Sequence, residues 1–265
     1  ANAMSIGTGV TLNFNHNANV TVANNIAGAG ALNKVGATTL SMTGLDTYTG
    51  ATGTGSAGGI VYTRDVAPST SGFTGSGFVT IQPSSASFAN PVVSAYTFDN
   101  TIAGLTIGKA GSTANVTLNT VVNIAGPITV TGSVVTLNQS VSTSSSLTVN
   151  GQTVLNGGTI TSTGSQNFNG AVTLGADATL TSGGTAAVSF AGTINGGFAL
   201  VVNSAGATTF GGAVGSTTPL TRLTTDAAGS VLVQGGLVKT QAFKDPKYVG
   251  DPINAVKIFN EKEVD

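Results

Sequence analysis

Cysteine and tryptophan are absent from this chain of 265 residues, and charged residues make up only 7% of it. The lack of cysteine excludes disulfides, thiolate metal sites and cysteine nucleophiles. The formal net charge is -1, with 9 basic and 10 acidic side chains. Nucleic acids and anionic membranes bind clustered Lys and Arg, so we expect neither as a partner.

Long hydrophobic runs are also missing, because no apolar stretch approaches the roughly 20 residues that a membrane helix needs. The opening ANAMSIGTG has neither the basic nor the apolar region of a secretion signal. We therefore expect a segment of a longer protein, or a chain without its targeting segment. With 40% hydrophobic residues, the chain has enough apolar surface for a buried core.

Short alternating runs such as VTLNF, NVTLN and ATLTSG fill the chain from Ile6 onward, each closed by Gly, Asn or Ser. Apolar and polar residues that alternate with a period of two predict β-strands. No window before Gly236 keeps a helical period, so a βαβ fold with a nucleotide site is not expected. The sequence predicts an all-β body over residues 1–234.

Similar strand-turn phrases recur at a spacing typical of solenoids. They start at Leu105, Ile128, Leu147, Val172, Leu200 and Leu223, which gives intervals of 23, 19, 25, 28 and 23 residues. Each repeat would form one coil of a parallel β-helix, right-handed like other parallel crossovers. An antiparallel sandwich is the competing architecture, because it also consists of short strands at regular spacing.

The stretch Gly28–Thr63 resembles the passenger-associated repeat of autotransporters. The matching residues, in order, are Gly28, Gly30, Leu32, Lys34, Gly36, Thr39, Leu40, Thr43, Gly44, Tyr48, Gly50, Ala57 and Gly58. The later phrases FNGAVTLGADATLTSGG and TTFGGAVGSTTPLTRLTTDAAGSVLV resemble repeats of filamentous-haemagglutinin-like surface proteins. Together these resemblances imply a parallel β-helix over about residues 6–234, exported through an outer-membrane translocator barrel, with adhesion or simple length as its function.

No catalytic, cofactor-binding or metal-binding residue is predicted, although several residues deserve inspection. His16 lacks recognisable partners and is expected in an exposed turn. Wide separation in sequence does not forbid clustering of acids across coils, beside Arg64 or Arg222, as carbohydrate-active enzymes require. The acids in question are Asp46, Asp65, Asp99, Asp177 and Asp226.

Other polar and glycine-rich stretches have structural explanations. Ser142–Ser146 is expected to be an exposed turn or a glycan-bearing strip, and the glycine pairs Gly183–Gly184 and Gly211–Gly212 to be turns and not phosphate loops. Asn19 and Asn115 begin glycosylation acceptor patterns, which arise easily by chance in this composition.

The final stretch differs from everything before it, because 10 of the 19 charges lie in the last 27 residues. Residues Gly235–Asp265 resemble the first β/α unit of the cyclase subunit of imidazole glycerol phosphate synthase, in the variant found in surface-polysaccharide gene clusters. Asp251 would cap a helix with Pro252 at its first position. An ungapped alignment places the family's catalytic aspartate position at Val231, where a valine cannot move protons.

We therefore expect a domain boundary near residue 235, between a surface β-helix and a fragment that is not an independent domain. The predicted function is a non-catalytic structural or adhesive segment outside the cell, at the bacterial outer-membrane surface. Its partners would be glycans or proteins of a host or neighbouring cell, without a small-molecule substrate or cofactor. The alternatives are a β-helix carbohydrate-active enzyme and, on the tail alone, a cyclase-like enzyme.

Overall fold

The computed structural model describes residues 3–226, 228–236, 238–240 and 243–244, and these residues form strands, bridges and turns without any helix. Contacts divide the chain into two compact units, Ala1–Ser133 and Val134–Asp265. Within the described ranges, no helix is long and apolar enough to cross a membrane. The helix expected from Asp251 lies outside the described residues.

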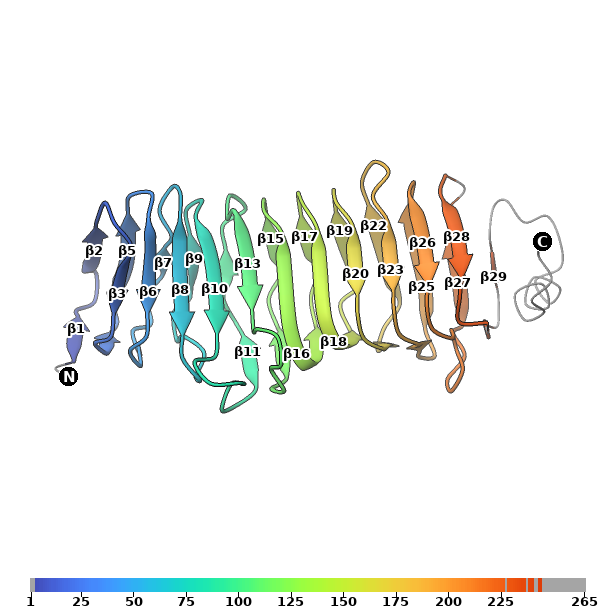
Figure 1. Ribbon diagram of the computed structural model, residues 1–265, viewed down its shortest axis with the longest axis horizontal. Helices are drawn as coiled ribbons and strands as arrows, with labels where there is room; N and C mark the ends of the chain where they lie inside the picture. Colours follow the sequence, from blue (N-terminus) through green and yellow to red (C-terminus); the bar gives the residue numbers. More distant parts are fainter. Residues whose placement is uncertain (1–2, 227, 237, 241–242, 245–265) are drawn as a thin grey trace. The chain divides into compact units, whose positions relative to one another are not determined.

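The first unit is a stack of short parallel strands (Figure 1). They are β1 Met4–Ile6, β2 Thr11–Asn15, β3 Val20–Val22, β4 Ile26–Gly28, β5 Ala31–Val35, β6 Thr39–Met42, β7 Thr52–Gly53, β8 Gly59–Thr63, β9 Gly72–Thr74, β10 Phe78–Gln82, β11 Val92–Ser94, β12 Thr97–Phe98, β13 Gly104–Ile107, β14 Val116–Leu118 and β15 Val122–Ile124. β16, Ile128–Leu137, begins in this unit.

Two long ladders run through the first unit. One joins β2, β5, β7, β9 and β12, and the other joins β3, β6, β8, β10 and β13 before reaching the start of β16. β1 pairs with β4, and β11 pairs with β14. All these pairings are parallel and join consecutive coils, as Leu12↔Leu32 and Leu32↔Thr52 illustrate.

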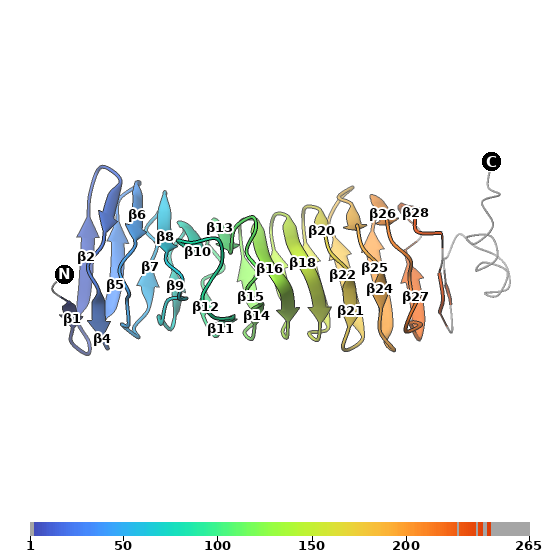
Figure 2. The same cartoon turned by 60° about the horizontal axis from the view of Figure 1, so that its bottom comes forward.

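The second unit repeats this arrangement (Figure 2). Its strands are β17 Val141–Thr143, β18 Leu147–Leu155, β19 Thr159–Ser162, β20 Gln166–Phe168, β21 Val172–Leu174, β22 Ala178–Ser182, β23 Val188–Phe190, β24 Ile194–Asn195, β25 Ala199–Ser204, β26 Ala207–Phe210, β27 Arg222–Thr225, β28 Ser230–Val233 and β29 Phe243–Lys244. One ladder runs β17, β19, β22, β25, β27 and β29, and another runs β18, β20, β23, β26 and β28.

Each unit is thus a parallel β-solenoid. The predicted parallel β-helix is confirmed, and the antiparallel sandwich is wrong, because the pairs are parallel and connect successive coils. Inward residues alternate with outward ones along most strands: in β22 Ala178, Leu180 and Ser182 are buried, whereas Thr179 and Thr181 are half-buried. Stacking buries the inward residues against the coils before and after, so neither unit needs a second layer.

The interior is mostly aliphatic, with a cluster of aromatic rings around Phe73 in the first unit and a stacked column in the second. The rings of Phe168 and Phe190 stack with centroids 5.3 Å apart, and those of Phe190 and Phe210 with centroids 5.5 Å apart. Outside, asparagines pair between coils, as in the Nδ2 to Oδ1 bond of 3.0 Å from Asn33 to Asn13. Identical side chains at the same register position on successive coils can form such ladders.

The predicted repeat register is correct at some coils and wrong at others. Leu105 pairs with Ile128, and Leu200 pairs with Leu223, as the phrase spacing predicts. Leu147, however, pairs with Gln166, while Val172 pairs with Thr153. The phrase beginning at Val172 therefore lies in a different strand of its coil from the phrase beginning at Leu147.

Hydrogen bonding continues beyond residue 235, where the sequence predicts a boundary. The Gly235 N–H donates to the Phe210 carbonyl, and the Lys239 N–H donates to the Val214 carbonyl. Val238 is buried and bridges Val214, and β29 pairs with β27. The residues after 235 that the structure describes thus form part of another coil, and the domain boundary itself stays a prediction.

Candidate functional site

Lys34, one of the positions at which Gly28–Thr63 resembles the passenger-associated repeat, is a buried lysine. Lys34 lies in β5 with an exposed fraction of 1%, and its Nζ donates to the carbonyls of Gly36 at 2.7 Å and Ala57 at 2.8 Å. Burial lowers the pKa of this amine, because the charged form loses its water. Gly36 has a φ of 96°, a left-handed conformation that glycine adopts without strain. The Lys34 amine is therefore held by backbone carbonyls of its own coil and of the next one.

An ion pair lies in the interior of the same unit. Asp46 precedes β7 and Arg64 follows β8, and Asp46 Oδ2 lies 2.7 Å from Arg64 Nη1. Arg64 also donates to the Gly44 carbonyl, and Asp46 Oδ1 accepts the Ile26 N–H. The structure thus brings together one acid and one arginine that the sequence singled out.

Burial is the largest influence on the pKa of Asp46. Desolvation raises the pKa of its carboxyl, while the positive charge of Arg64 and the Ile26 N–H oppose that rise. Nε and Nη2 of Arg64 are buried without a hydrogen-bond partner in the described part of the chain. The Arg64 Cζ lies 4.9 Å from the centroid of the Tyr62 ring, a cation–π contact that partly compensates.

Hydroxyl groups extend the polar interior from one coil to the next. The Tyr48 hydroxyl bonds to the hydroxyls of Tyr62 and Thr52, and Thr52 donates to Thr70. Burial raises the pKa of both phenols, and for the fully buried Tyr62 it does so strongly. Both phenols therefore stay neutral at ordinary pH and act as hydrogen-bonding groups.

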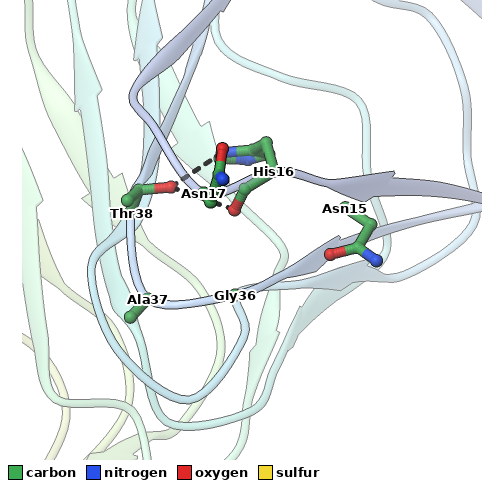
Figure 3. Close-up of a pocket in the computed structure, with 6 residues that line it drawn as sticks. All are labelled: Asn15, His16, Asn17, Gly36, Ala37 and Thr38. Carbon is green, nitrogen blue, oxygen red and sulfur yellow. Dashed lines mark hydrogen bonds between the residues drawn. The ribbon is translucent and has the colours of Figure 1, made fainter.

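His16 lies in a turn beside an open cleft of about 580 Å³, shown in Figure 3. Its Nδ1 is 2.7 Å from the Ala18 carbonyl and 2.7 Å from the Thr38 hydroxyl, which belongs to the next coil. Asparagines and small residues line the remainder of the cleft. The turn position agrees with the sequence-based expectation, but the residue is half-buried and not fully exposed. The contact of its Nδ1 with Thr38 ties two coils together.

Three of the predicted acids bind backbone N–H groups one coil away. Asp65 Oδ1 accepts the Ser85 N–H, Asp99 Oδ2 accepts the Gly75 N–H, and Asp177 Oδ1 accepts the Ala199 N–H. The Ser85 N–H is the main reason that the pKa of Asp65 is lowered. These contacts give the carboxylates a role in joining successive coils.

The other residues that the sequence singled out lie on strands and turns of the solenoid. Arg222 begins β27, and Asp226 follows that strand, its N–H donating to the Val202 carbonyl. Asn19 Oδ1 accepts the Thr39 N–H. Gly184 has a φ of 54° in a turn, as the sequence predicts. Ser142–Ser146 covers the end of β17 and the turn that follows it.

A groove that the sequence did not reveal lies between two coils of the first unit. It has a volume of about 360 Å³ and is lined by Val66, Ala67, Pro68, Ser69, Thr70, Asn90, Pro91, Val93, Ala95 and Tyr96. None of these side chains is ionised at neutral pH. The two prolines, which lack an N–H for strand pairing, were the available signal in the sequence.

Among the described residues, no group of three or more His, Asp or Glu side chains could hold a metal ion. Val231, at the aligned position of the cyclase aspartate, lies in β28 and pairs with Thr208. The stretch from 223 to 234 contains the last three residues of β27 and the whole of β28, in agreement with the all-β body predicted up to residue 234.

Comparison with known proteins finds short matches to one group of enzymes. The chain is 74% identical over 35 residues to "Putative imidazole glycerol phosphate synthase subunit hisF2" of Pseudomonas aeruginosa, which is 13% of this chain and 14% of that protein. Proteins with corresponding names from Leptospira interrogans and Vibrio vulnificus match at 65% over 37 residues and 77% over 30 residues, covering 14% and 11% of this chain and 15% and 12% of their own lengths.

These matches confirm that a short stretch of the chain is similar to this group of proteins. The chain spans about a seventh of the length of the relatives that it matches. No family model matches the chain, and no solved structure matches it. The resemblance to autotransporter repeats stays a prediction.

Proposed function

We propose that this chain is a segment of a secreted or cell-surface β-solenoid that acts as an adhesin or a structural spacer and is not catalytic. The observation that carries the proposal is the structural role of the repeat-like motif. Lys34 and Tyr48, two of its polar positions, are both buried and both hydrogen-bonded in the solenoid interior. These two positions of the stretch that resembles the repeat therefore stabilise the solenoid interior, which supports a structural role for the segment.

The exterior supports the same proposal. Uncharged hydroxyl and amide side chains occupy many outward positions, with Thr159 and Thr161 next to Thr179 and Thr181 in register on neighbouring coils. Such a surface suits contact with glycans or proteins and gives no attraction to nucleic acid. We place the protein outside the cell, at the bacterial outer-membrane surface, after passage through a translocator barrel.

The carbohydrate-active alternative gains no support from the acids described above. Asp46 faces Arg64 in the interior, and Asp65, Asp99 and Asp177 hold backbone N–H groups of other coils. The cyclase alternative gains none from Val231, since an aliphatic side chain cannot transfer a proton. The short match to the synthase subunits therefore contributes nothing to the proposed function.

Surface display tests the proposal. The chain is placed between a secretion signal and an autotransporter barrel in a Gram-negative host, and a strain carrying the barrel alone is the control. We expect intact cells to present the chain to added protease and antibody. Adhesion to immobilised glycans and matrix proteins then separates an adhesin, which raises it several-fold, from a spacer, which does not. Retention of a folded chain inside the cell would overturn the proposal.

A further inference from the structure

The groove in the first unit lies between two neighbouring coils that are joined by two backbone hydrogen bonds. Between these two bonds the coils contain different numbers of residues. The Ala89 N–H donates to the Asp65 carbonyl at 2.8 Å, and the Thr97 N–H donates to the Ser71 carbonyl at 3.1 Å. Five residues, 66–70, lie between these points on the earlier coil, whereas seven, 90–96, lie between them on the later coil. The longer segment must therefore bow away from the shorter one, in the region of β11 in Figure 1.

This bow leaves one edge of a strand without a partner. β11 pairs with β14 through the Val92 N–H, which donates to Asn115, and the Ser94 carbonyl, which accepts from Asn119. In a parallel ladder alternate residues use one edge, so the N–H and C=O of Val93 point to the opposite edge. In the described part of the chain, no strand pairs with β11 on that side.

The opposite wall of the groove is held by side chains. The Ser69 hydroxyl donates to the Tyr48 carbonyl, the Thr70 hydroxyl to the Gly50 carbonyl, and the Tyr96 hydroxyl to the Pro68 carbonyl at 2.7 Å. These contacts fix the wall before any ligand arrives, which reduces the entropic cost of binding.

The chemistry of the lining indicates what would fit. Val66 and Val93 are 43% and 55% exposed, so apolar surface is available on both walls. The lining carries no ionised side chain, and an ion in the groove would lose water without gaining a partner. A free strand edge between apolar side chains is the arrangement that binds extended peptides by strand addition.

We propose that this groove binds an extended, uncharged peptide segment of a partner protein, which adds as a strand to the free edge of β11. The N–H and C=O of Val93 would hold its backbone, and its alternate apolar side chains would contact Val66 and Val93. This inference goes beyond the proposed function and does not depend on where the protein acts.

Amide hydrogen exchange on the full chain tests the proposal directly. The probe is an acetylated and amidated Thr-Val-Thr-Val-Thr-Val peptide, and cellohexaose serves as a neutral glycan for comparison. We expect saturable binding of the peptide and exchange of the Val93 N–H that is slowed by about tenfold or more, since the amide gains a hydrogen bond. The Val92 N–H, already bonded to Asn115, is the internal control and should not change.

A pair of variants provides a second measurement. Val93→Glu places a carboxylate in the groove and should weaken peptide binding about tenfold or more, because desolvating an unpaired charge is costly. Val121→Glu is the matched control, since Val121 is 56% exposed in the same unit and does not line the groove. It should bind the peptide as the unaltered chain does.

Several outcomes would overturn the proposal. These are peptide binding without protection of the Val93 N–H, equal weakening by both variants, and no saturation up to about 1 mM peptide, the weak end of specific affinity. Protection of the same N–H by cellohexaose but not by the peptide would instead assign the groove to a glycan.

Discussion

Asp46 Oδ2 lies 2.7 Å from Arg64 Nη1 inside the first unit, although the two residues are 18 positions apart in sequence. The pair is almost completely buried, with side-chain exposures of 0% for Asp46 and 6% for Arg64. Removing one partner of such a pair leaves a charge in a poorly solvated interior, whereas removing both does not.

We expect Arg64→Met to lower the free energy of unfolding by about 3–5 kcal/mol, the usual cost of breaking a buried pair from one side. The double variant Asp46→Leu with Arg64→Met should recover part of that loss. Urea denaturation followed by circular dichroism measures both. A single variant within about 1 kcal/mol of the unaltered chain would show that the pair is not buried in solution.

The pH dependence of Asp46 gives an independent test. Its folded pKa is raised above the ordinary value of 3.8, so its contribution to stability is present below 3.8 and is lost as pH rises through the folded pKa. The stability of the unaltered chain relative to Asp46→Asn should therefore fall as pH rises from below 3.8. Denaturation at a series of pH values checks this, and parallel curves for the two proteins would contradict it.

Lys34 should make the stability of the chain depend on pH in the alkaline range. Its pKa is lowered from 10.5 by burial, so the unfolded chain holds this proton at pH values where the folded chain has released it. The stability of the unaltered chain relative to Lys34→Met should rise with pH in the interval just below 10.5. Near neutral pH the variant should be less stable by about 1–3 kcal/mol, because the carbonyls of Gly36 and Ala57 lose their donor.

The aromatic column of the second unit should dominate the packing of its coils. Phe190 stacks against both Phe168 and Phe210, so we expect Phe190→Ala to cost about 3–5 kcal/mol and Phe190→Leu clearly less. Phe198→Ala is the control, because that side chain is 37% exposed and should cost under about 1 kcal/mol. Equal costs at the two positions, measured by thermal and urea unfolding, would contradict the stacked arrangement.

Removal of residues 243–265 should change the stability of the remainder by under about 1 kcal/mol, the size expected when few buried contacts are lost. Only two residues of β29 pair with β27 in the described part of this range. A chain ending at residue 236 is the matched comparison, because it also loses the buried Val238. A drop of many degrees in the melting temperature of residues 1–242 would show that the end of the chain acts as a cap.

The sequence predicts the fold class well because each strand carries its own alternation. Pairs such as Leu200↔Leu223 follow directly from phrase spacing. Phrases alone do not tell which face of a coil they occupy, which is why Leu147 and Val172 lie on different strands than expected. The Asp46–Arg64 pair and the Val93 edge depend on which residues of adjacent coils meet, and single-chain patterns do not contain that information.

The unequal coils around β11 also bear on how such a chain tolerates changes in length. The two residues that the later coil has in excess are absorbed between Ala89 and Thr97, and regular pairing resumes at Thr97↔Gly72. An insertion at this place therefore alters one local surface while leaving the partners of later strands unchanged. A stacked solenoid can in this way acquire or lose a recognition feature at a single coil, without redesign of the coils on either side.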